Sequence, residues 1–226
     1  MTTEPRIADE GRRRRLTRAE AQALTRRRLL DAANDVFCAK GFRGASLMDV
    51  ADRAGYTIGA VYSNFASKDE LFHGLMRERL RMAEAMLAAA FPDKEADPGV
   101  AIESVEERIE QELDRMARDE DSVPPGWWRL LYEYRTFAAD DPAAWAELAA
   151  SERRCREIIA AWIERFAAST GVVLPLPAIE LAELSTALTD GLRAAHAAGR
   201  SRMTSGKGLR LVVKAFLATS PRIDPQ

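Results

Sequence analysis

A short segment near the N-terminus contains side chains that are suited to binding phosphate groups. Thr57 and Tyr62 carry hydroxyl groups and Lys68 carries an ammonium group. Such donors, together with the free N–H groups of helix N-termini, are the groups that contact phosphate oxygens of nucleic acids. Ser46 and Ser67 stand where helix N-termini are expected. This part of the sequence therefore predicts a surface that binds anions.

A second group of cations lies just upstream of this segment. Eight arginines occur from Arg12 to Arg28, against a single acidic residue, Glu20. The first four, which precede the first expected helix, are Arg12, Arg13, Arg14 and Arg15. Flexible basic arms in this position reach into DNA minor grooves. The alternative is that these arginines only keep a disordered arm, residues 1–16, in solution.

The charge of the chain is unevenly distributed. Residues 1–80 contain 15 Lys and Arg against 11 Asp and Glu, whereas residues 81–226 contain 18 against 24, within a formal net charge of −2. A basic front end on an acidic body indicates that a polyanion is bound at one end of the molecule.

The composition favours a cytoplasmic protein with no membrane partner. No apolar run approaches the roughly 18 to 20 residues of a membrane-spanning helix, and the first residues lack the apolar core of a secretory signal. Cys38 and Cys155 are the only cysteines of the 226 residues and form no metal-ligand pattern. We expect a reducing compartment and two buried thiols.

The phosphate-binding groups must be positioned by two very short helices. Residues 46–54 start with Ser46 and Asp49 in the spacing of a capping box. Gly55 then supplies the positive φ of a sharp exit. Isolated helices of this length are marginal in water. The first short helix is therefore expected to depend on its neighbours for stability.

The second short helix, residues 58–64, follows Thr57 as its N-cap. Val61 and Phe65 are four residues apart and share the face that packs onto the first short helix. The other residues then face outward. A sharp corner between two such helices is typical of a helix-turn-helix, which holds its second helix where it can enter a DNA major groove.

The rest of the chain has apolar residues at helical spacing and shows no strand pattern, so the fold class is all-α. The expected helices are 17–40, 67–90, 99–119, 126–139, 142–168, 177–198 and 206–218. Gly41 is expected to end the first of them in the left-handed α region, with Phe42 folding back. The predicted parts are a disordered basic arm at 1–16, a DNA-binding domain at 17–66 and a larger helical domain at 67–226.

The segment RLLDAANDVFCAKGFRGASLMDVADRAGYTIGAVYSNFASKDELF resembles the N-terminal domain of the TetR family of bacterial repressors. The residues that carry the resemblance are Phe37, Gly41, Ala51, Ala54, Gly55, Gly59, Tyr62, Phe65, Lys68 and Leu71. Tyr56 and Asn64 depart from the commonest residues at their positions. The resemblance implies a helix-turn-helix regulator whose larger domain senses a ligand and forms a dimer.

The resemblance also implies a role for each residue of the DNA-binding segment. Ser46 and Thr57 would cap helices and touch phosphates. Ile58, Gly59, Ala60 and Ser63 would face bases, whereas Tyr62, Asn64 and Lys68 would bind the DNA backbone. Contact with a thymine methyl is the expected readout for Ile58 and Ala60. The alternative for these two is that they only cover the helical bundle.

Two helices of the larger domain carry apolar and small residues at three- and four-residue spacing. By resemblance, they would form a four-helix seam with their copies in a twofold dimer. The predicted interface consists of Leu148, Cys155, Ile159, Trp162, Phe166, Leu184, Leu188, Gly191 and Ala195. The alternative is the ordinary core of a monomer.

An aromatic cluster in the larger domain suggests a cavity for a small lipophilic effector. The candidate lining residues are Met86, Met116, Trp127, Trp128, Tyr132, Phe137 and His196. Plain core packing is the alternative for each of them.

Catalysis is not expected, because the chain has only two histidines and no nucleophile–base pattern, P-loop or dinucleotide glycine motif. Glu70 and His73 form a Glu-x-x-His pair, but His196 has no such partner, so no metal and no cofactor are predicted. The sequence favours a homodimeric repressor that a small ligand releases from a palindromic double-stranded DNA operator. A helical scaffold protein that does not bind DNA is the alternative, and an activator is also consistent with the sequence.

Overall fold

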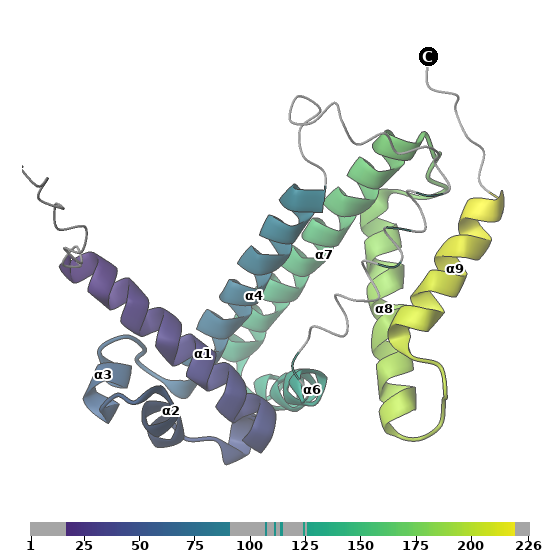
Figure 1. Cartoon of the computed structure of the whole chain (residues 1–226). Helices are drawn as coiled ribbons and strands as arrows, with labels where there is room; N and C mark the ends of the chain where they lie inside the picture. Colours follow the sequence, from purple (N-terminus) through teal and green to yellow (C-terminus); the bar gives the residue numbers. More distant parts are fainter. Residues whose placement is uncertain are drawn as a thin grey trace, which may run out of the picture.

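The computed structural model describes residues 17–90, 107, 111, 114, 124 and 126–219, and Figure 1 shows its helices. In chain order they are α1 (Arg18–Gly44), α2 (Leu47–Ala54), α3 (Ile58–Tyr62), α4 (Lys68–Ala90), α6 (Trp127–Ala138), α7 (Pro142–Thr170), α8 (Ala178–Ala197) and α9 (Ser205–Thr219). None of these helices is both long and apolar enough to span a membrane. The described residues contain no strand, and the predicted all-α class is confirmed. Most of the predicted helix 99–119 lies outside the described residues.

The helices form a small end and a larger body (Figure 1). α1, α2 and α3 make up the small end, and α4 leads from it into the body, where it lies along α7. α6 packs against α1 and α7, while α8 and α9 form the edge farthest from α3. This arrangement places the two short helices at one extremity of the molecule.

The first long helix is interrupted where the sequence predicts its end. Gly41 has φ 76° and ψ 169°, so its φ is positive as predicted, but its ψ is extended and does not belong to the left-handed α region. Only glycine adopts this combination readily. Phe42 then folds back into the core, where it is 1% exposed and its ring centroid lies 4.7 Å from that of Tyr134.

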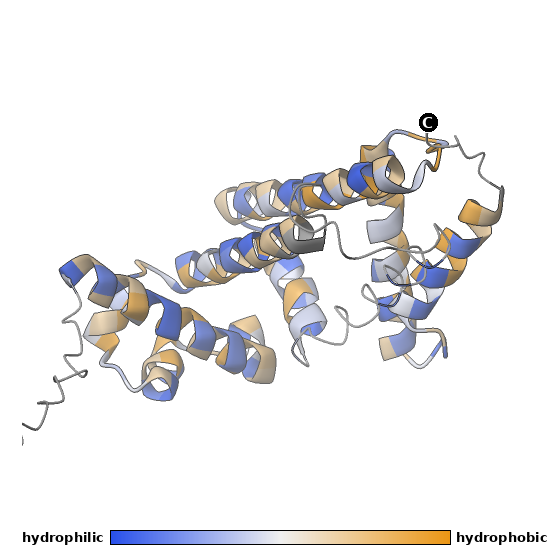
Figure 2. Cartoon of the chain, turned by 45° about the horizontal axis from the view of Figure 1, so that its top comes forward, coloured by the Kyte–Doolittle hydropathy of each residue, from blue (hydrophilic) through white to orange (hydrophobic). Residues whose placement is uncertain are grey.

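The main hydrophobic core of the described residues runs from the small end into the body. It extends from Leu29 on α1 through Phe65 and Phe72 to Tyr134 on α6 and Leu148 on α7. The core therefore crosses the sequence boundary at residues 66 and 67. Figure 2 shows hydrophilic and hydrophobic residues alternating along α1, α4 and α7, as expected for helices with one buried side.

The two thiols differ in burial. Cys38 is buried on α1, as predicted, whereas Cys155 on α7 is exposed. The prediction of two buried thiols is therefore wrong for Cys155. Apolar residues at three- and four-residue spacing mark one face of a helix, but the spacing does not indicate which of these residues a neighbouring helix covers.

Candidate nucleic-acid interface

The first short helix begins and ends as its sequence predicts. The N–H of Asp49 donates to Oγ of Ser46 at 3.1 Å, and the N–H of Ser46 donates to the Asp49 carboxylate at 3.0 Å. Gly55 ends the helix with φ 71° and ψ 30°. Lys40 bonds the same carboxylate at 2.6 Å, and this bond, with those from Ser46, lowers the pKa of Asp49 to about 2. The capping box is therefore tied to α1.

The second short helix turns one residue inward and most of the others outward. Val61 is 0% exposed and Phe65, just beyond the helix, is 1% exposed. Tyr62, by contrast, is 58% exposed. The exposed residues of this segment are Thr57, Gly59, Tyr62 and Ser63, and Ile58, Ala60 and Asn64 are half-buried. Thr57 caps α3 by accepting the N–H of Ala60 at 3.3 Å.

Arginines of α1 hold α3 and its flanking turns in place. Arg26 donates to the backbone oxygen of Asn64 at 2.7 Å, and its guanidinium lies 4.1 Å from the centre of the Phe65 ring. Arg28 donates to the hydroxyl of Tyr56 at 3.4 Å. Both arginines therefore have structural partners. Tyr56, which departs from the commonest residue at its position, thus has a hydrogen-bond partner on α1.

Two of the predicted phosphate-binding residues make bonds within the protein. Lys68 Nζ donates to the backbone oxygens of Phe42 at 2.9 Å and Ala45 at 3.1 Å. An ammonium group has three donors, so one is left for a phosphate. The side chain of Asn64 donates to the oxygen of Ala60 at 2.9 Å, which leaves one amide N–H. Their contact with DNA stays a prediction.

The other predicted DNA-binding groups differ in how the structure places them. Ser46 is exposed at the start of α2. Ser67 caps α4 by accepting the N–H of Glu70 at 3.0 Å, but the Glu70 carboxylate accepts from Ala66 instead of closing a capping box on Ser67. The four arginines Arg12, Arg13, Arg14 and Arg15 lie outside the described residues.

Two oppositely charged residues of α6 hold the broken end of α1. Arg129 donates to the backbone oxygens of Cys38 and Ala39 at 2.9 and 3.3 Å, which neutralises carbonyls at the end of the regular helix. The Glu133 carboxylate accepts the N–H groups of Phe42 at 3.1 Å and Arg43 at 2.7 Å, just after the break. We call Arg129 and Glu133 the α6 clamp. The clamp joins the small end to the body.

Sequence reasoning missed the α6 clamp. Its only local signal is an Arg and a Glu four residues apart on one helix face, a spacing that also occurs on ordinary solvated surfaces. The partners lie about ninety positions away in sequence, and a break at Gly41 does not reveal what satisfies its N–H groups.

The predicted ligand-lining aromatic residues on α6 mostly fill space inside the protein. Trp127 is 4% exposed, lies against Phe72 with ring centroids 6.4 Å apart, and is covered by the guanidinium of Arg79. The Phe137 ring centroid is 4.9 Å from that of Phe42. Trp127 is therefore a core residue, and its prediction as a cavity wall is wrong, because its neighbours pack directly against it.

The remaining predicted lining residues are spread over several surroundings. The guanidinium of Arg193 lies 3.6 Å from the ring centre of half-buried Trp128, and the Tyr132 hydroxyl donates to the oxygen of Asp190 at 2.9 Å. His196 is exposed at the end of α8, so its prediction as a cavity residue is wrong. Met116 and the side chain of Met86 lie outside the described residues.

The predicted dimer stripe divides between the core and the surface. Leu148 is 1% exposed in the main core, and Phe166 is 7% exposed against Val172 and Leu217. Both predictions are wrong, since each side chain is covered within its own chain. Trp162 stacks on Phe166 with centroids 5.3 Å apart, and Ile159 packs beside Ala160. The α7 part of the stripe thus mainly serves the interior.

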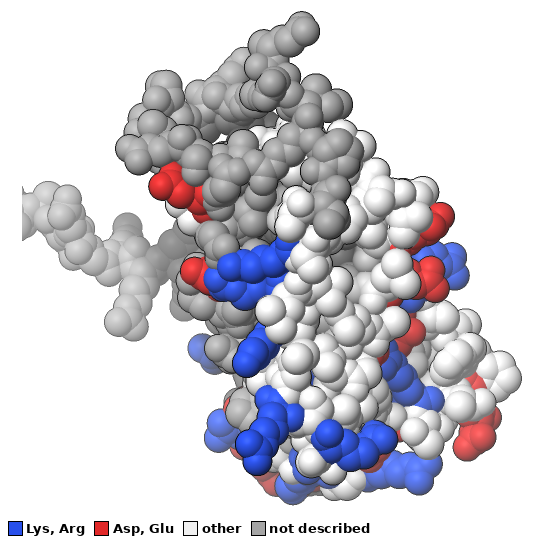
Figure 3. Space-filling model, turned by 90° about the vertical axis from the view of Figure 1, so that its right-hand side faces the viewer, with Lys and Arg blue, Asp and Glu red and all other residues white. Residues whose placement is uncertain are grey.

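The α8 part of the stripe is more open, and α9 adds to it. Leu184 is 58% exposed, and no heavy atom lies within 4 Å of a Cβ placed on Gly191. Leu188 and Ala195 are half-buried. Leu211 and Val212 on α9 are 49% and 53% exposed. Figure 3, which faces the α9 side, shows a broad uncharged surface with Lys and Arg gathered at its lower end.

The sequence of the small end has close counterparts in known regulators. Residues 29–75 match the family model described as bacterial regulatory proteins, tetR family. The chain is 45% identical over 65 residues to the HTH-type transcriptional regulator SrpR of Pseudomonas putida, a match of 29% of this chain and 30% of SrpR. It is 42% identical over 77 residues to the HTH-type transcriptional repressor BepR of Brucella suis, covering 34% and 36%. The matches thus span about a third of these relatives.

The whole fold has counterparts among solved structures. The crystal structure of a TetR-family transcriptional regulator from a Rhodococcus species covers 86% of this chain and 99% of its own, with a TM-score of 0.65 and 21% identity. The likeness extends the agreement in fold to the larger helical body. Residues 29–75 are thus similar to the N-terminal part of TetR-family regulators, and the chain as a whole shares the fold of a solved member of that family.

Proposed function

We propose that this chain is a DNA-binding repressor that works as a homodimer and is released from a palindromic operator by a small ligand. The observation that carries the proposal is the exposure of α3. Val61 and Phe65 anchor the helix inside the protein while Tyr62 is 58% exposed beside exposed Gly59. The atom nearest to a Cβ on Gly59 is Oγ1 of Thr57 at 3.8 Å, so the space there is open for a groove wall.

The proposed dimer pairs through α8 and α9. A single α3 offers little contact surface, and two copies on half-sites about one helical turn apart supply the missing affinity. The exposed apolar side chains for this pairing are Ile179, Leu184, Leu211 and Val212. α7, which the sequence put into the seam, is mainly used inside the chain, and α9 takes its place in the proposal.

The proposed release uses the links between the body and the small end. α4 starts directly after the helix-turn-helix, and the α6 clamp holds α1. A small, lipophilic effector in the body would move α4 and α6, and with them the spacing of the two α3 helices. The coupling is reciprocal, so operator DNA must weaken effector binding by the factor by which the effector weakens operator binding.

Binding to DNA from around the coding region tests the function directly. We expect the purified dimer to retard one such fragment at low salt and to prefer it over unrelated DNA. If the folded protein bound no genomic fragment, the scaffold alternative would replace this proposal. Transcription from the bound promoter is then measured in cells that lack the protein. It should rise if the protein is a repressor and fall if it is an activator.

Tyr62→Phe is expected to weaken binding to all DNA sequences by about tenfold or more, because a hydroxyl bond to a charged phosphate contributes about 1.5–3 kcal/mol. Fluorescence anisotropy with operator and scrambled DNA measures this change. Tyr132→Phe is the matched control, since its hydroxyl bonds to the backbone of α8. A changed ranking of sequences in Tyr62→Phe would contradict a role limited to phosphate contact.

Replacing Arg12, Arg13, Arg14 and Arg15 together by alanine is expected to reduce the salt dependence of DNA binding. Each lost phosphate contact should flatten the slope of log affinity against log salt by about 0.9. Anisotropy titrations at several salt concentrations give this slope. An unchanged slope would mean that the arm only contributes to solubility.

A further inference from the structure

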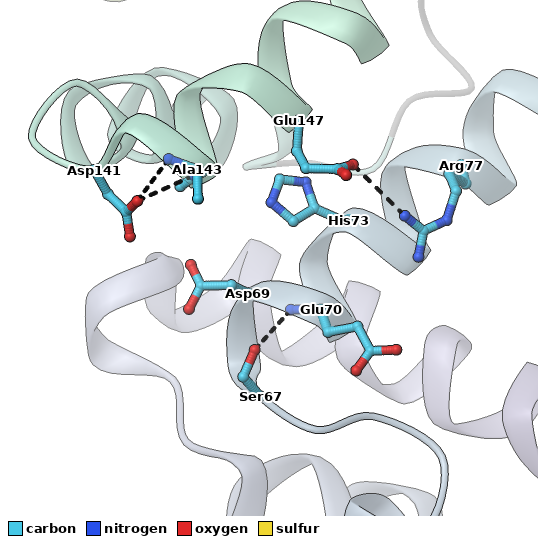
Figure 4. A pocket seen from close by; sticks show the side chains of 9 residues that line it. Ser67, Asp69, Glu70, His73, Arg77, Asp141, Ala143 and Glu147 are labelled. Carbon is cyan, nitrogen blue, oxygen red and sulfur yellow. Dashed lines mark hydrogen bonds and ion pairs between the residues drawn. The ribbon is translucent and has the colours of Figure 1, made fainter.

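A cavity of about 410 Å³ lies between the first turns of α4 and α7, and none of the predicted effector residues lines it. Its acidic residues are Asp69 and Glu70 on α4, Asp141 just before α7, and Glu147 on α7. Arg77 adds one positive charge to this lining. Figure 4 shows that these side chains surround His73. The cavity therefore has an excess of hydrogen-bond acceptors and of negative charge.

Side chains of the protein already accept N–H groups at both helix N-termini of this cavity. Oδ1 of Asp141 accepts the N–H groups of Ala143 and Ala144 at 2.9 and 3.2 Å, and Ser67 accepts that of Glu70. The helix ends thus offer little to an anion. Glu147 is only loosely paired, since its carboxylate lies 3.9 Å from Arg77.

The hydrogen bonds of His73 leave one of its nitrogens available as an acceptor. The Tyr134 hydroxyl lies 3.3 Å from Oδ1 of Asp69 and 2.8 Å from Nε2 of His73. An ionised carboxylate can only accept, so the hydroxyl donates to Asp69 and Nε2–H of His73 donates to the hydroxyl oxygen. Burial lowers the pKa of His73 and favours the neutral ring, whose Nδ1 then carries a lone pair.

Nδ1 of His73 has no partner for that lone pair among the described residues. The residue is 7% exposed, and Nδ1 is buried without a hydrogen bond. Buried polar atoms in proteins nearly always have a partner, so an unsatisfied one that lines a cavity points to a bound donor. Figure 4 places the imidazole beside the carboxylate of Glu147, which would share the same donor.

We propose that this cavity binds a small protonated amine, whose ammonium group donates to Nδ1 of His73 and to the carboxylate of Glu147. An ammonium has several N–H donors and a positive charge, which matches both features of the lining. The described residues contain no group of three or more His, Cys, Asp and Glu side chains placed to hold a metal ion. The bound amine would tie α4 to α7.

The test is calorimetry on the full-length protein without DNA, with putrescine as the probe and butanol as the uncharged comparison. We expect putrescine to bind and butanol to give no signal. Glu147→Gln should weaken putrescine by about tenfold, the effect of losing one charge-assisted bond. Glu164→Gln, an exposed change on the same helix, should leave it unchanged. Absence of putrescine binding, or equal affinities of the two variants, would overturn the proposal.

Nitrogen NMR of the two histidines adds a readout that a structural role alone would not move. Putrescine should shift the Nδ1 signal of His73, whereas that of exposed His196 stays fixed. If magnesium ions shifted His73 equally at the same concentration, the amine would be replaced by a divalent cation. Because no DNA is present, failure here leaves the proposed repressor function standing, and failure to bind DNA leaves the amine site standing.

Discussion

Leu184→Glu is expected to yield a folded single chain that binds operator DNA at least about 100-fold more weakly than the parent protein. In a dimer, the first α3 to bind holds the second near its half-site, and the effective concentration this provides multiplies affinity by about 10²–10⁴. A carboxylate in an apolar seam is buried without a partner, which opposes pairing. Because Leu184 is 58% exposed in the single chain, the same change costs the monomer little.

Met82→Glu is the matched control for this prediction. Met82 on α4 is also 58% exposed, but it lies outside the proposed seam of α8 and α9. Light scattering should show a dimer for Met82→Glu and a monomer for Leu184→Glu, and anisotropy should show a loss of DNA affinity only for Leu184→Glu. If both variants stayed dimeric and bound DNA equally, the α8–α9 seam would be wrong.

The helix-turn-helix was predictable because its determinants are close together in sequence. Ser46 and Asp49 cap one helix, Gly55 turns the chain, and Thr57 caps the next helix, so a few residues fix the whole motif. Each capping hydrogen bond joins residues that are three positions apart, and the residue types preferred at helix ends are the ones found there. The outward face of α3 follows once Val61 is assigned to the core.

The larger body was less predictable because its helices leave a choice of partners. A stripe such as that of α7 shows that a face is buried but not what covers it. The sequence pattern predicts that Leu148 and Phe166 contact a second chain, yet the main core and α9 of the same chain cover them. The exposed residues of α9 gave no signal in the sequence, since a short amphipathic helix fits a core equally well.

His73 shows the same limit at a site. Its spacing from Glu70 resembles a metal-binding pair, but the Glu70 carboxylate bonds the N–H of Ala66 and His73 bonds Tyr134 on another helix. The acidic cavity forms only when the starts of α4 and α7 meet. Asp141 and Glu147 are more than sixty positions from His73, so no local pattern connects them.

Gly126→Ala is expected to separate α6 from α1, with a loss of roughly 3 kcal/mol or more in the free energy of unfolding. Gly126 has φ 90°, which costs a residue with a Cβ about 1–2 kcal/mol. The new Cβ would lie 2.3 Å from the backbone oxygen of Cys38, which cannot rotate away. That oxygen also accepts a bond from Arg129, so relieving the clash weakens the α6 clamp as well.

Gly55→Ala is the matched control, because it imposes the φ penalty without the clash. Gly55 has φ 71°, and nothing lies within 4 Å of its Cβ position. Thermal unfolding should show a shift of a few degrees for Gly55→Ala and a larger one for Gly126→Ala, at about 2–4 °C per kcal/mol for a chain of this size. Equal shifts would mean that α6 moves freely relative to α1.

The same pair of variants separates stability from coupling. If the α6 clamp transmits movement of the body to α1, Gly126→Ala should reduce the effect of an effector on operator affinity, even at a temperature where the protein is fully folded. Gly55→Ala should change operator affinity itself, since it alters the turn that positions α3. The factor by which the effector weakens operator binding should stay the same. A full effector response in Gly126→Ala would show that the signal does not need the α6 clamp, and α4, which contacts α1 and starts directly after the helix-turn-helix, would carry it.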